Sequence, residues 1–393
     1  MGLQPSNPYA DTSNFVHPFT EDLYIPVGAS RMNDERNSSD ILKPNTNCKT
    51  IHRVNVLKTG YTGIWSVTTA NNLGPVPRTG HFYCYDPPNH TVYIGYGITQ
   101  SEQPLNDFWA LDTLTYNWRE IKLYGAQICP RSGSRACLIG THIVIFGGYC
   151  NPNYFSDLHT IDITTGEVVM VQTQGTPPSP RSSPIVCIGN NKFFVWGGFN
   201  GEWPNELNVL DLQTMTWSQV PQQISGRAAV PFVPVDNILY SYGGSKLGGF
   251  LCLNMETYEM AVRECIGAPP PSQSSSAGMV LVEKYLFYFG GKANNKWTLM
   301  YACDIQRLWW FVFHVMPDGE SVSISDGSVS EQGLFMLPRI HSFGVCYVAE
   351  KRTILAFLGY PEKDPPPLFT VYIGDAMAVI HHREDMLAVL NLS

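Results

Sequence analysis

The feature that most constrains this fold is a short apolar strand that ends in two glycines and recurs along the chain. Four full copies end at Gly148, Gly198, Gly244 and Gly291, at spacings of 50, 46 and 47 residues. Two weaker copies end at Gly97 and Gly359, with Tyr96 and Leu358 in the first glycine position. Self-similarity at such a period is typical of repeat architectures, in which each unit buries its faces against its neighbours.

Other residues keep register with the glycines. Arg131, Arg181 and Arg227 each precede the second glycine by 17 residues, whereas Arg78 and Arg339 precede it by 19 and 20. An acidic residue is followed six residues later by tryptophan at Asp112 and Trp118, Asp211 and Trp217, and Asp304 and Trp310. The spacing therefore predicts that each unit of about 46 to 50 residues contains four strands with turns between them.

This pattern resembles the kelch repeat, and the resemblance covers almost the whole chain. It rests on the glycine pairs 147–148, 197–198, 243–244 and 290–291 with the acidic and tryptophan residues that follow. The rival WD40 repeat should show Gly-His and Trp-Asp pairs, but Gly80-His81 is the single Gly-His pair and no Trp-Asp pair occurs. The resemblance implies an all-β fold, a kelch-type β-propeller of four-stranded blades.

Blade number depends on the ends of the chain. The segment 23–29 resembles a degenerate glycine-pair strand, and the segment that ends at Trp65 resembles the two strands that follow it. The apolar segment 386–392 could supply the missing inner strand. We expect seven blades closed by joining N- and C-terminal strands, with six as the alternative. We expect residues 1–19 to form a tail and residues 20–393 to form a single propeller.

Composition narrows the function classes. A net charge of −8 argues against a nucleic-acid partner. The ten cysteines include no CxxC pair, and Cys84, Cys137 and Cys187 each lie six residues after an arginine. Such equivalent positions predict small buried hydrophobes with free thiols, hence a cytoplasmic or nuclear location. We expect no signal peptide, no transmembrane segment, no cofactor and a monomer.

Strand direction predicts where a partner would bind. The segment before each arginine and the loop after each glycine pair should lie on one face, because the second strand returns to the level where the first begins. The face should bind a partner protein, because arginine and aromatic residues are enriched at interfaces. The resemblance to kelch proteins that bind acidic peptides through arginines and aromatics implies an acidic peptide as the ligand. Its candidate residues are Arg78, Arg131, Arg181, Arg227, Arg339, Tyr149, Tyr154, Phe155, Phe199, Trp203, Trp297 and Tyr360. A second interpretation of the arginines is structural, through backbone carbonyls and carboxylates.

Two further predictions concern the core and one long loop. Trp65, Trp118, Trp217 and Trp310 should be buried between blades. The segment 315–337 carries Asp318, Glu320, Asp326 and Glu331 with no basic residue before Arg339. We expect it to be a mobile loop on the arginine face that competes with the partner, with an inert insertion as the alternative.

An enzyme is the alternative function. A kelch-related oxidase carries copper, which needs converging histidines and tyrosines, whereas the ten histidines here are scattered and only His381-His382 are adjacent. The sequence also lacks the Gly-x-Ser-x-Gly, His-Glu-x-x-His and phosphate-loop patterns. We therefore expect a scaffold or adaptor rather than a copper oxidase-like or hydrolase protein, with no catalytic or metal-binding residue.

Overall fold

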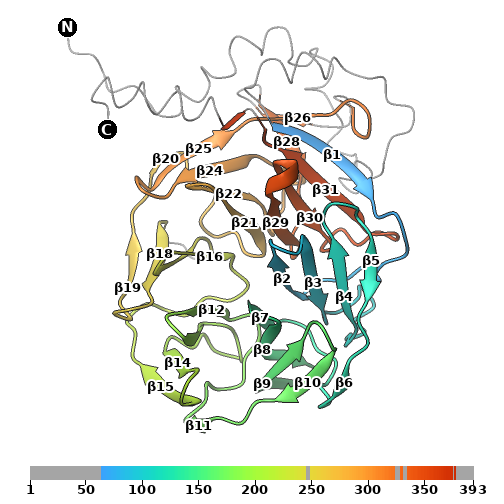
Figure 1. Ribbon diagram of the computed structural model, residues 1–393. Helices are drawn as coiled ribbons and strands as arrows, with labels where there is room; N and C mark the ends of the chain where they lie inside the picture. The colour runs from blue at the N-terminus through green and yellow to red at the C-terminus, as the bar shows by residue number, and fades with distance from the viewer. Residues whose placement is uncertain (1–62, 245–247, 324–327, 331–333, 375, 378–393) are drawn as a thin grey trace, which may run out of the picture.

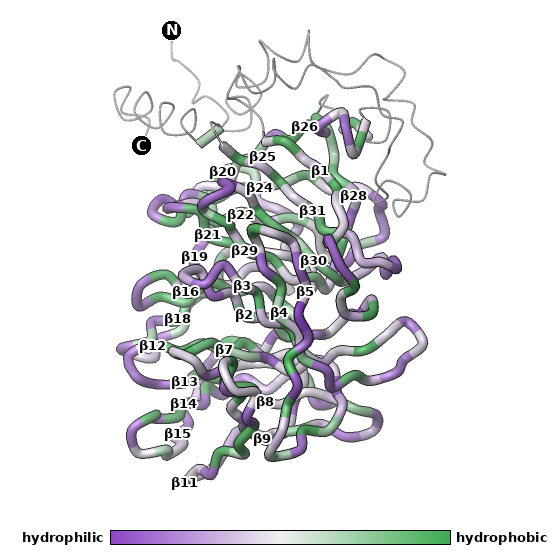
Figure 2. The backbone as a smooth tube through the Cα atoms, turned by 45° about the vertical axis from the view of Figure 1, so that its right-hand side comes forward, coloured by the Kyte–Doolittle hydropathy of each residue, from purple (hydrophilic) through white to green (hydrophobic). Residues whose placement is uncertain are grey.

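The computed structural model describes residues 63–244, 248–323, 328–330, 334–374 and 376–377. These residues form short strands arranged around a common centre (Figure 1), with one 3-10 turn at Ala349–Lys351. Apolar residues follow the strands and hydrophilic residues gather in the connections (Figure 2). The fold is all-β and propeller-like, as the repeat predicts.

Four-stranded antiparallel units make up most of the described chain. The first contains β2 (Phe82–Asp86), β3 (Thr91–Gly95), β4 (Phe108–Asp112) and β5 (Trp118–Glu120). The second contains β7 (Arg135–Ile139), β8 (His142–Cys150), β9 (Asn153–Asp162) and β10 (Glu167–Met170). The third contains β12 (Ile185–Gly189), β13 (Lys192–Trp196), β14 (Leu207–Asp211) and β15 (Thr216–Val220).

Three more units follow in the described residues. The fourth contains β16 (Phe232–Val235), β17 (Ile238–Ser241), β18 (Phe250–Asn254) and β19 (Met260–Arg263). The fifth contains β21 (Ala277–Val282), β22 (Tyr285–Gly290), β24 (Met300–Asp304) and β25 (Trp309–Phe313). The sixth contains β29 (Gly344–Val348), β30 (Thr353–Phe357), β31 (Pro367–Tyr372) and β1 (Gly63–Thr69).

Strand β1 corrects one assignment made from the sequence. It pairs antiparallel with β31, with Trp65 opposite Val371 and Thr69 opposite Pro367. The strand that contains Trp65 is therefore the outer strand of the last repeat and does not belong to a separate seventh unit. The sequence could not show this, because the pairing joins segments about 300 residues apart. The predicted partners 23–29 and 386–392, and the tail 1–19, lie outside the described residues.

Short connecting strands support the position of β1. After the outer strand of one unit, β6 (Tyr124–Gly125), β11 (Gln174–Gly175) and β20 (Ile266–Gly267) pair in parallel with the outer strands of other units. After β25, β26 (Val315–Pro317) pairs in the same way with β1. Strand β1 thus pairs in parallel with a short connecting strand, as the outer strands β10, β15 and β25 do.

A repeated backbone hydrogen bond joins each unit to the next. The backbone N–H of the second glycine in each unit donates to the backbone carbonyl of the residue in the arginine position of the following unit. The pairs are Gly97 to Arg131, Gly148 to Arg181, Gly198 to Arg227, Gly244 to Ser274, Gly291 to Ile340 and Gly359 to Arg78, at 2.8 to 3.0 Å. The last pair leads from the sixth unit back to the first.

The first glycine of each pair allows this close approach. Gly147 has φ +67°, and a Cβ atom there would lie 2.7 Å from the carbonyl oxygen of Arg181. A side chain would therefore be strained in conformation and would collide with the neighbouring backbone. Packing between units thus favours glycine here, whereas Tyr96 and Leu358 adopt the same positive φ, +64° and +57°, in the other two units.

The tryptophans are buried as predicted. Trp65 and Trp310 are 0% exposed, and Trp118 and Trp217 are 5% exposed. The ring of Trp217 lies 6.3 Å from Phe193 of its own sheet and 6.3 Å from Phe146 of the preceding one. These side chains fill the space between adjacent sheets.

The nine cysteines among the described residues are free, and Cys84 and Cys187 are buried.

The acidic segment after β25 differs from its prediction where it is described. Strand β26 lies along β1, and Asp318 is buried. Its carboxylate accepts backbone hydrogen bonds from Glu320, Ser321 and Val322, and the hydroxyl of Ser321 accepts one from Val67. The first part of the segment is therefore packed on the outer strand β1. It continues through β27 (Ser328–Val329) to β28 (Phe335–Pro338), which pairs with β23 (Trp297–Thr298).

Candidate functional site: the loop face

The first three repeat arginines are bound inside the protein. Arg78 forms an ion pair with Asp107, Arg131 with Asp157 and Arg181 with Glu206. The same guanidinium groups donate to the carbonyls of Tyr96, Gly147 and Gly197, at 3.1 to 3.2 Å. All three side chains are at most 2% exposed. Arg227 repeats the carbonyl contact, to Gly243 at 3.0 Å, and is 4% exposed.

These contacts favour the interpretation that the arginines have a structural role. They differ from it in one respect, because the side chain forms its hydrogen bonds within its own repeat. Each guanidinium binds acceptors of its own repeat, whereas the arginine carbonyl binds the neighbouring repeat. Burial is the largest single influence and would raise the pKa values of Asp107 and Glu206, but the hydrogen bonds and charges of Arg78 and Arg181, together with further hydrogen bonds, lower both pKa values. Because their side chains are buried and paired, Arg78, Arg131, Arg181 and Arg227 do not line the exposed surface.

Arg339 lies one residue out of register with the other arginines. Ile340 supplies the carbonyl that binds the neighbouring repeat, as Arg131 and Arg181 do elsewhere. The Arg339 side chain instead donates to the carbonyls of Asn295 and Trp297, both at 2.8 Å. Arg339 is half-buried. It therefore fixes the loop after Gly291 and keeps part of its surface at the loop face.

Isolated backbone bridges place the predicted aromatic residues on one face. Tyr149 pairs with Ser132, Phe199 with Ser182 and Tyr360 with His341. Each pair joins the residue after a second glycine to the residue that follows the arginine position, so the three aromatics are equivalent by repeat. The strand-direction argument predicted this arrangement.

Four of the aromatics form a row. Ring centroids lie 4.7 Å apart for Tyr149 and Tyr154, 6.3 Å for Tyr154 and Phe199, and 4.9 Å for Phe199 and Trp203. Trp203 is 57% exposed, and the other three rings are partly exposed. Contacts of this kind hold large apolar rings in place beside solvent, which is typical of interface hot spots. We call these four residues the aromatic row.

Two other predicted aromatics have different surroundings. Trp297 is 7% exposed because β23 packs it into the core near Phe335 and Leu337, so it does not line the surface. Phe155 lies under the guanidinium of Arg131, with 3.6 Å between the Arg131 Cζ and the ring centroid. Phe155 therefore supports a buried arginine rather than standing free.

A groove adjoins the remaining predicted residues Arg339 and Tyr360. Its volume is about 1060 Å³, and Lys292, Lys296 and Lys363 also line it. Glu362 is the acidic residue of this lining, so cations predominate. We call it the basic groove. The sequence argument missed Lys363 and His341, which a count of cations in the equivalent loops could have indicated.

His341 stacks on Tyr360 in this groove. Their ring centroids lie 4.8 Å apart with an interplanar angle of 17°. Burial, and then the charges of Lys292 and Arg339, lower the pKa of His341 to about 4. The histidine is therefore neutral near pH 7 and presents a flat ring beside the cations.

The described residues hold no group of three or more His, Cys, Asp or Glu side chains that could bind a metal ion. His381 and His382 lie outside them. No helix in the described part of the chain is long and apolar enough to cross a membrane.

Comparison with known proteins agrees with the repeat geometry and defines the class. A family model described as the KLHDC2/KLHL20/DRC7 Kelch-repeats domain matches residues 38–244, more than half of the chain. The chain belongs to the kelch-repeat family.

Several curated proteins are similar to the chain. Acyl-CoA-binding domain-containing protein 4 of Arabidopsis thaliana is 33% identical over 186 residues, which are 47% of this chain and 27% of that protein. Kelch domain-containing protein 2 of Bos taurus is 24% identical over 283 residues, 61% of this chain and 70% of that protein. Host cell factor 1 of Homo sapiens is 22% identical over 301 residues, which are 61% of this chain and 15% of that protein. The match spans about a quarter of the first of these relatives.

Proposed function

We propose that this protein is an interaction module, a scaffold or adaptor that binds a partner protein on the loop face and catalyses no reaction itself. Its membership of the kelch-repeat family, with relatives such as Kelch domain-containing protein 2 and Host cell factor 1, supports a role in protein interaction. The location we propose is cytoplasmic or nuclear, because free thiols suit a reducing compartment. The protein would act as a monomer.

The observation that carries the proposal is the basic groove. Lys292 is exposed, and Lys363 and Arg339 are partly exposed in one hollow of about 1060 Å³. Clustered cations attract an acidic segment and speed its encounter with the protein. We propose an acidic peptide segment of the partner as the ligand, with the aromatic row as a second contact region.

A ring of six blades would support this face. We propose that the six described units close on themselves, with β1 completing the last one. The support comes from the β1–β31 pairing and from the hydrogen bond between Gly359 and Arg78, which repeats the contact found between the other units. Closure protects the strand edges that an open sheet would expose.

Charge reversal in the groove tests the proposal. We expect the Lys292→Glu, Lys363→Glu double variant to lose partners that the wild-type protein retains from cell extract, because both substitutions place anions where an acidic segment would bind. The double variant should also lose binding of a hexaglutamate peptide, and wild-type binding of that peptide should weaken as salt is raised. Affinity purification and fluorescence anisotropy measure the two effects.

Lys122→Glu is the matched control. Lys122 is 81% exposed and lies between β5 and β6, outside the groove. This variant should retain the wild-type partners. The proposal fails if the groove variant and the control bind the same proteins and the peptide equally well.

A further inference from the structure

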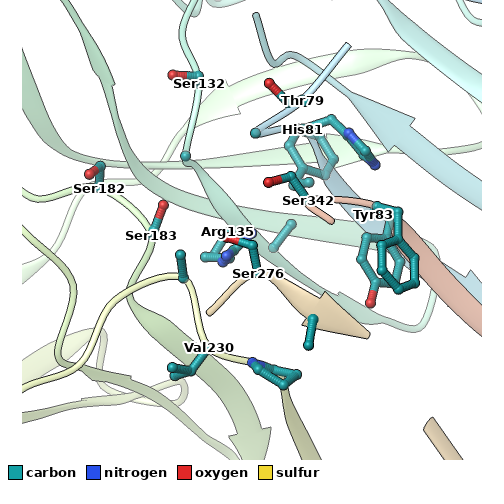
Figure 3. Close-up of a pocket in the computed structure, with 18 of the residues that line it drawn as sticks. Thr79, His81, Tyr83, Ser132, Arg135, Ser182, Ser183, Val230, Ser276 and Ser342 are labelled. Carbon is teal, nitrogen blue, oxygen red and sulfur yellow. The ribbon is translucent and has the colours of Figure 1, made fainter. Parts of the chain in front are cut away.

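A cavity of about 440 Å³ lies where the inner strands of the described units converge. Residues just after the arginine position contribute to it from every repeat, among them Thr79, Ser132, Ser183, Ala229, Ser276 and Ser342 (Figure 3). Ile98 and Tyr149 also line it, so the cavity reaches the loop face. It is separate from the basic groove.

Arg135 is the unusual residue of this lining. It stands four residues after Arg131, where the equivalent residues of the other repeats are Phe82, Ile185, Pro231, Gly278 and Gly344. A cation thus occupies a position that is apolar or glycine elsewhere in the ring. The repeat fold does not require it, which indicates a role particular to this protein.

The charge of Arg135 is not neutralised within the described part of the chain. Its side chain forms no ion pair or hydrogen bond with the described residues, and its Nε atom is buried. Burial lowers the pKa of Arg135. Arg135 is partly exposed, its Nε is buried, and buried charges are normally paired. The surroundings of Arg135 therefore favour an anion.

Other polar groups face the same cavity. His81 is 3% exposed, and neither ring nitrogen has a hydrogen-bond partner among the described residues. The side-chain hydroxyls of Ser132, Ser183 and Ser276 likewise make no hydrogen bond there. Figure 3 shows these residues and Arg135 around one opening. Hydroxyl and imidazole groups can each donate to an oxygen atom.

We propose that this cavity binds a small organic oxyanion, with its carboxylate or phosphoryl group on Arg135. A guanidinium matches both groups with two parallel hydrogen bonds, and the serine hydroxyls supply further donors. Val230, Met279 and Phe343 form an apolar wall beside them, which would contact the organic part of the ligand. The site would serve a low-molecular-weight ligand and is independent of the partner proposed for the loop face.

Titration calorimetry of the full chain with inorganic phosphate, acetate and benzoate tests the site at constant ionic strength. We expect saturable binding of at least one probe, with an increase in thermal midpoint. Phosphate binding would identify a phosphoryl ligand, and benzoate binding a carboxylate. Tighter binding of benzoate than of acetate would place its ring on the apolar wall. Arg135→Met should weaken binding by at least about tenfold, because charge-assisted hydrogen bonds are lost.

Arg263→Met is the matched control, because Arg263 is exposed on β19 and its substitution removes the same charge. This variant should bind like the wild type. If Arg135→Met does not fold, the NMR signals of the His81 ring in the wild-type protein provide the second measurement and should shift during titration with the bound probe. The proposal is overturned if none of the three probes binds, if Arg135→Met binds as tightly as Arg263→Met, or if the His81 signals do not move.

Discussion

The arginine of the repeat connects two neighbouring units through different atoms. In Arg131 and Arg181, the guanidinium group binds a carboxylate and a glycine carbonyl of the same unit. The carbonyl oxygen of the same residue accepts a hydrogen bond from the preceding unit. Ser274 and Ile340 preserve the backbone contact without a guanidinium. The backbone position is therefore common to all described units, and the side chain is an additional stabilising contact in four of them.

The two tryptophans of the third unit should differ in their effect on stability. Trp217→Ala should lower the free energy of unfolding by about 3 to 5 kcal/mol, because it removes a buried ring between two sheets and leaves a cavity. Trp203→Ala should have a small effect, because Trp203 is 57% exposed. Urea denaturation measures both, and equal midpoints for the two variants would contradict the burial argument.

At the scale of elements, β1 joins the beginning of the described chain to its end. It lies between β31 and β26, so it bonds with two segments that are each more than 240 residues away in sequence. Trp65 anchors it, with ring centroids 5.7 Å from Phe335 and 5.5 Å from Phe369. An outer strand from near the beginning of the chain and three strands from near its end thus share one sheet.

Hydrogen–deuterium exchange should reveal this dependence. Trp65→Ala should speed amide exchange in β31 more than in β14, because β31 loses its packed neighbour while the third unit remains intact. Trp217→Ala is the reciprocal control and should accelerate exchange in β14 more than in β31. Unchanged exchange of β31 in the Trp65 variant would show that β1 does not support the last unit.

At the scale of the whole molecule, the lining of the central cavity differs in charge from the chain as a whole. The net charge is −8, yet the central cavity carries Arg135 and His81 and no acidic residue in its described lining. Burial, and then the charges of Arg78 and Arg135, lower the pKa of His81 to about 3. The centre of the molecule therefore disfavours any additional positive charge.

Acid should destabilise the protein through this histidine. An unfolded histidine has a pKa of about 6.5, so the unfolded chain binds more protons than the folded one between about pH 6.5 and 3. The stability contributed by neutral His81 is complete above this window and decreases as pH falls through it, by up to about 1.4 kcal/mol per pH unit. His81→Phe should show a smaller loss of unfolding free energy between about pH 6.5 and 5. Urea denaturation at several pH values measures the slopes, and identical slopes for variant and wild type would contradict the assignment.

The accuracy of the sequence predictions follows from the range of the interactions involved. The glycine pairs, the alternating strands and the core positions of Trp118, Trp217 and Trp310 could be predicted, because they repeat within each unit and obey local backbone and packing rules. Strand direction also placed Tyr149, Phe199 and Tyr360 at equivalent positions. The burial of Arg78 and Trp297 could not be predicted, because it depends on acceptors and neighbours supplied by other strands.

By itself, the sequence determined the repeat, the all-β class and the core residues of each unit. The periodic glycine, acidic and tryptophan residues specify the same local structure in each repeat. The tertiary structure decided which unit β1 completes, where the first part of the acidic segment packs, and which cations remain at the surface. Each of these depends on contacts between residues far apart in the chain. The position of Arg135 shows the difference: its charge is visible in the sequence, but its lack of a neutralising partner among the described residues emerges only when the units converge on the central cavity.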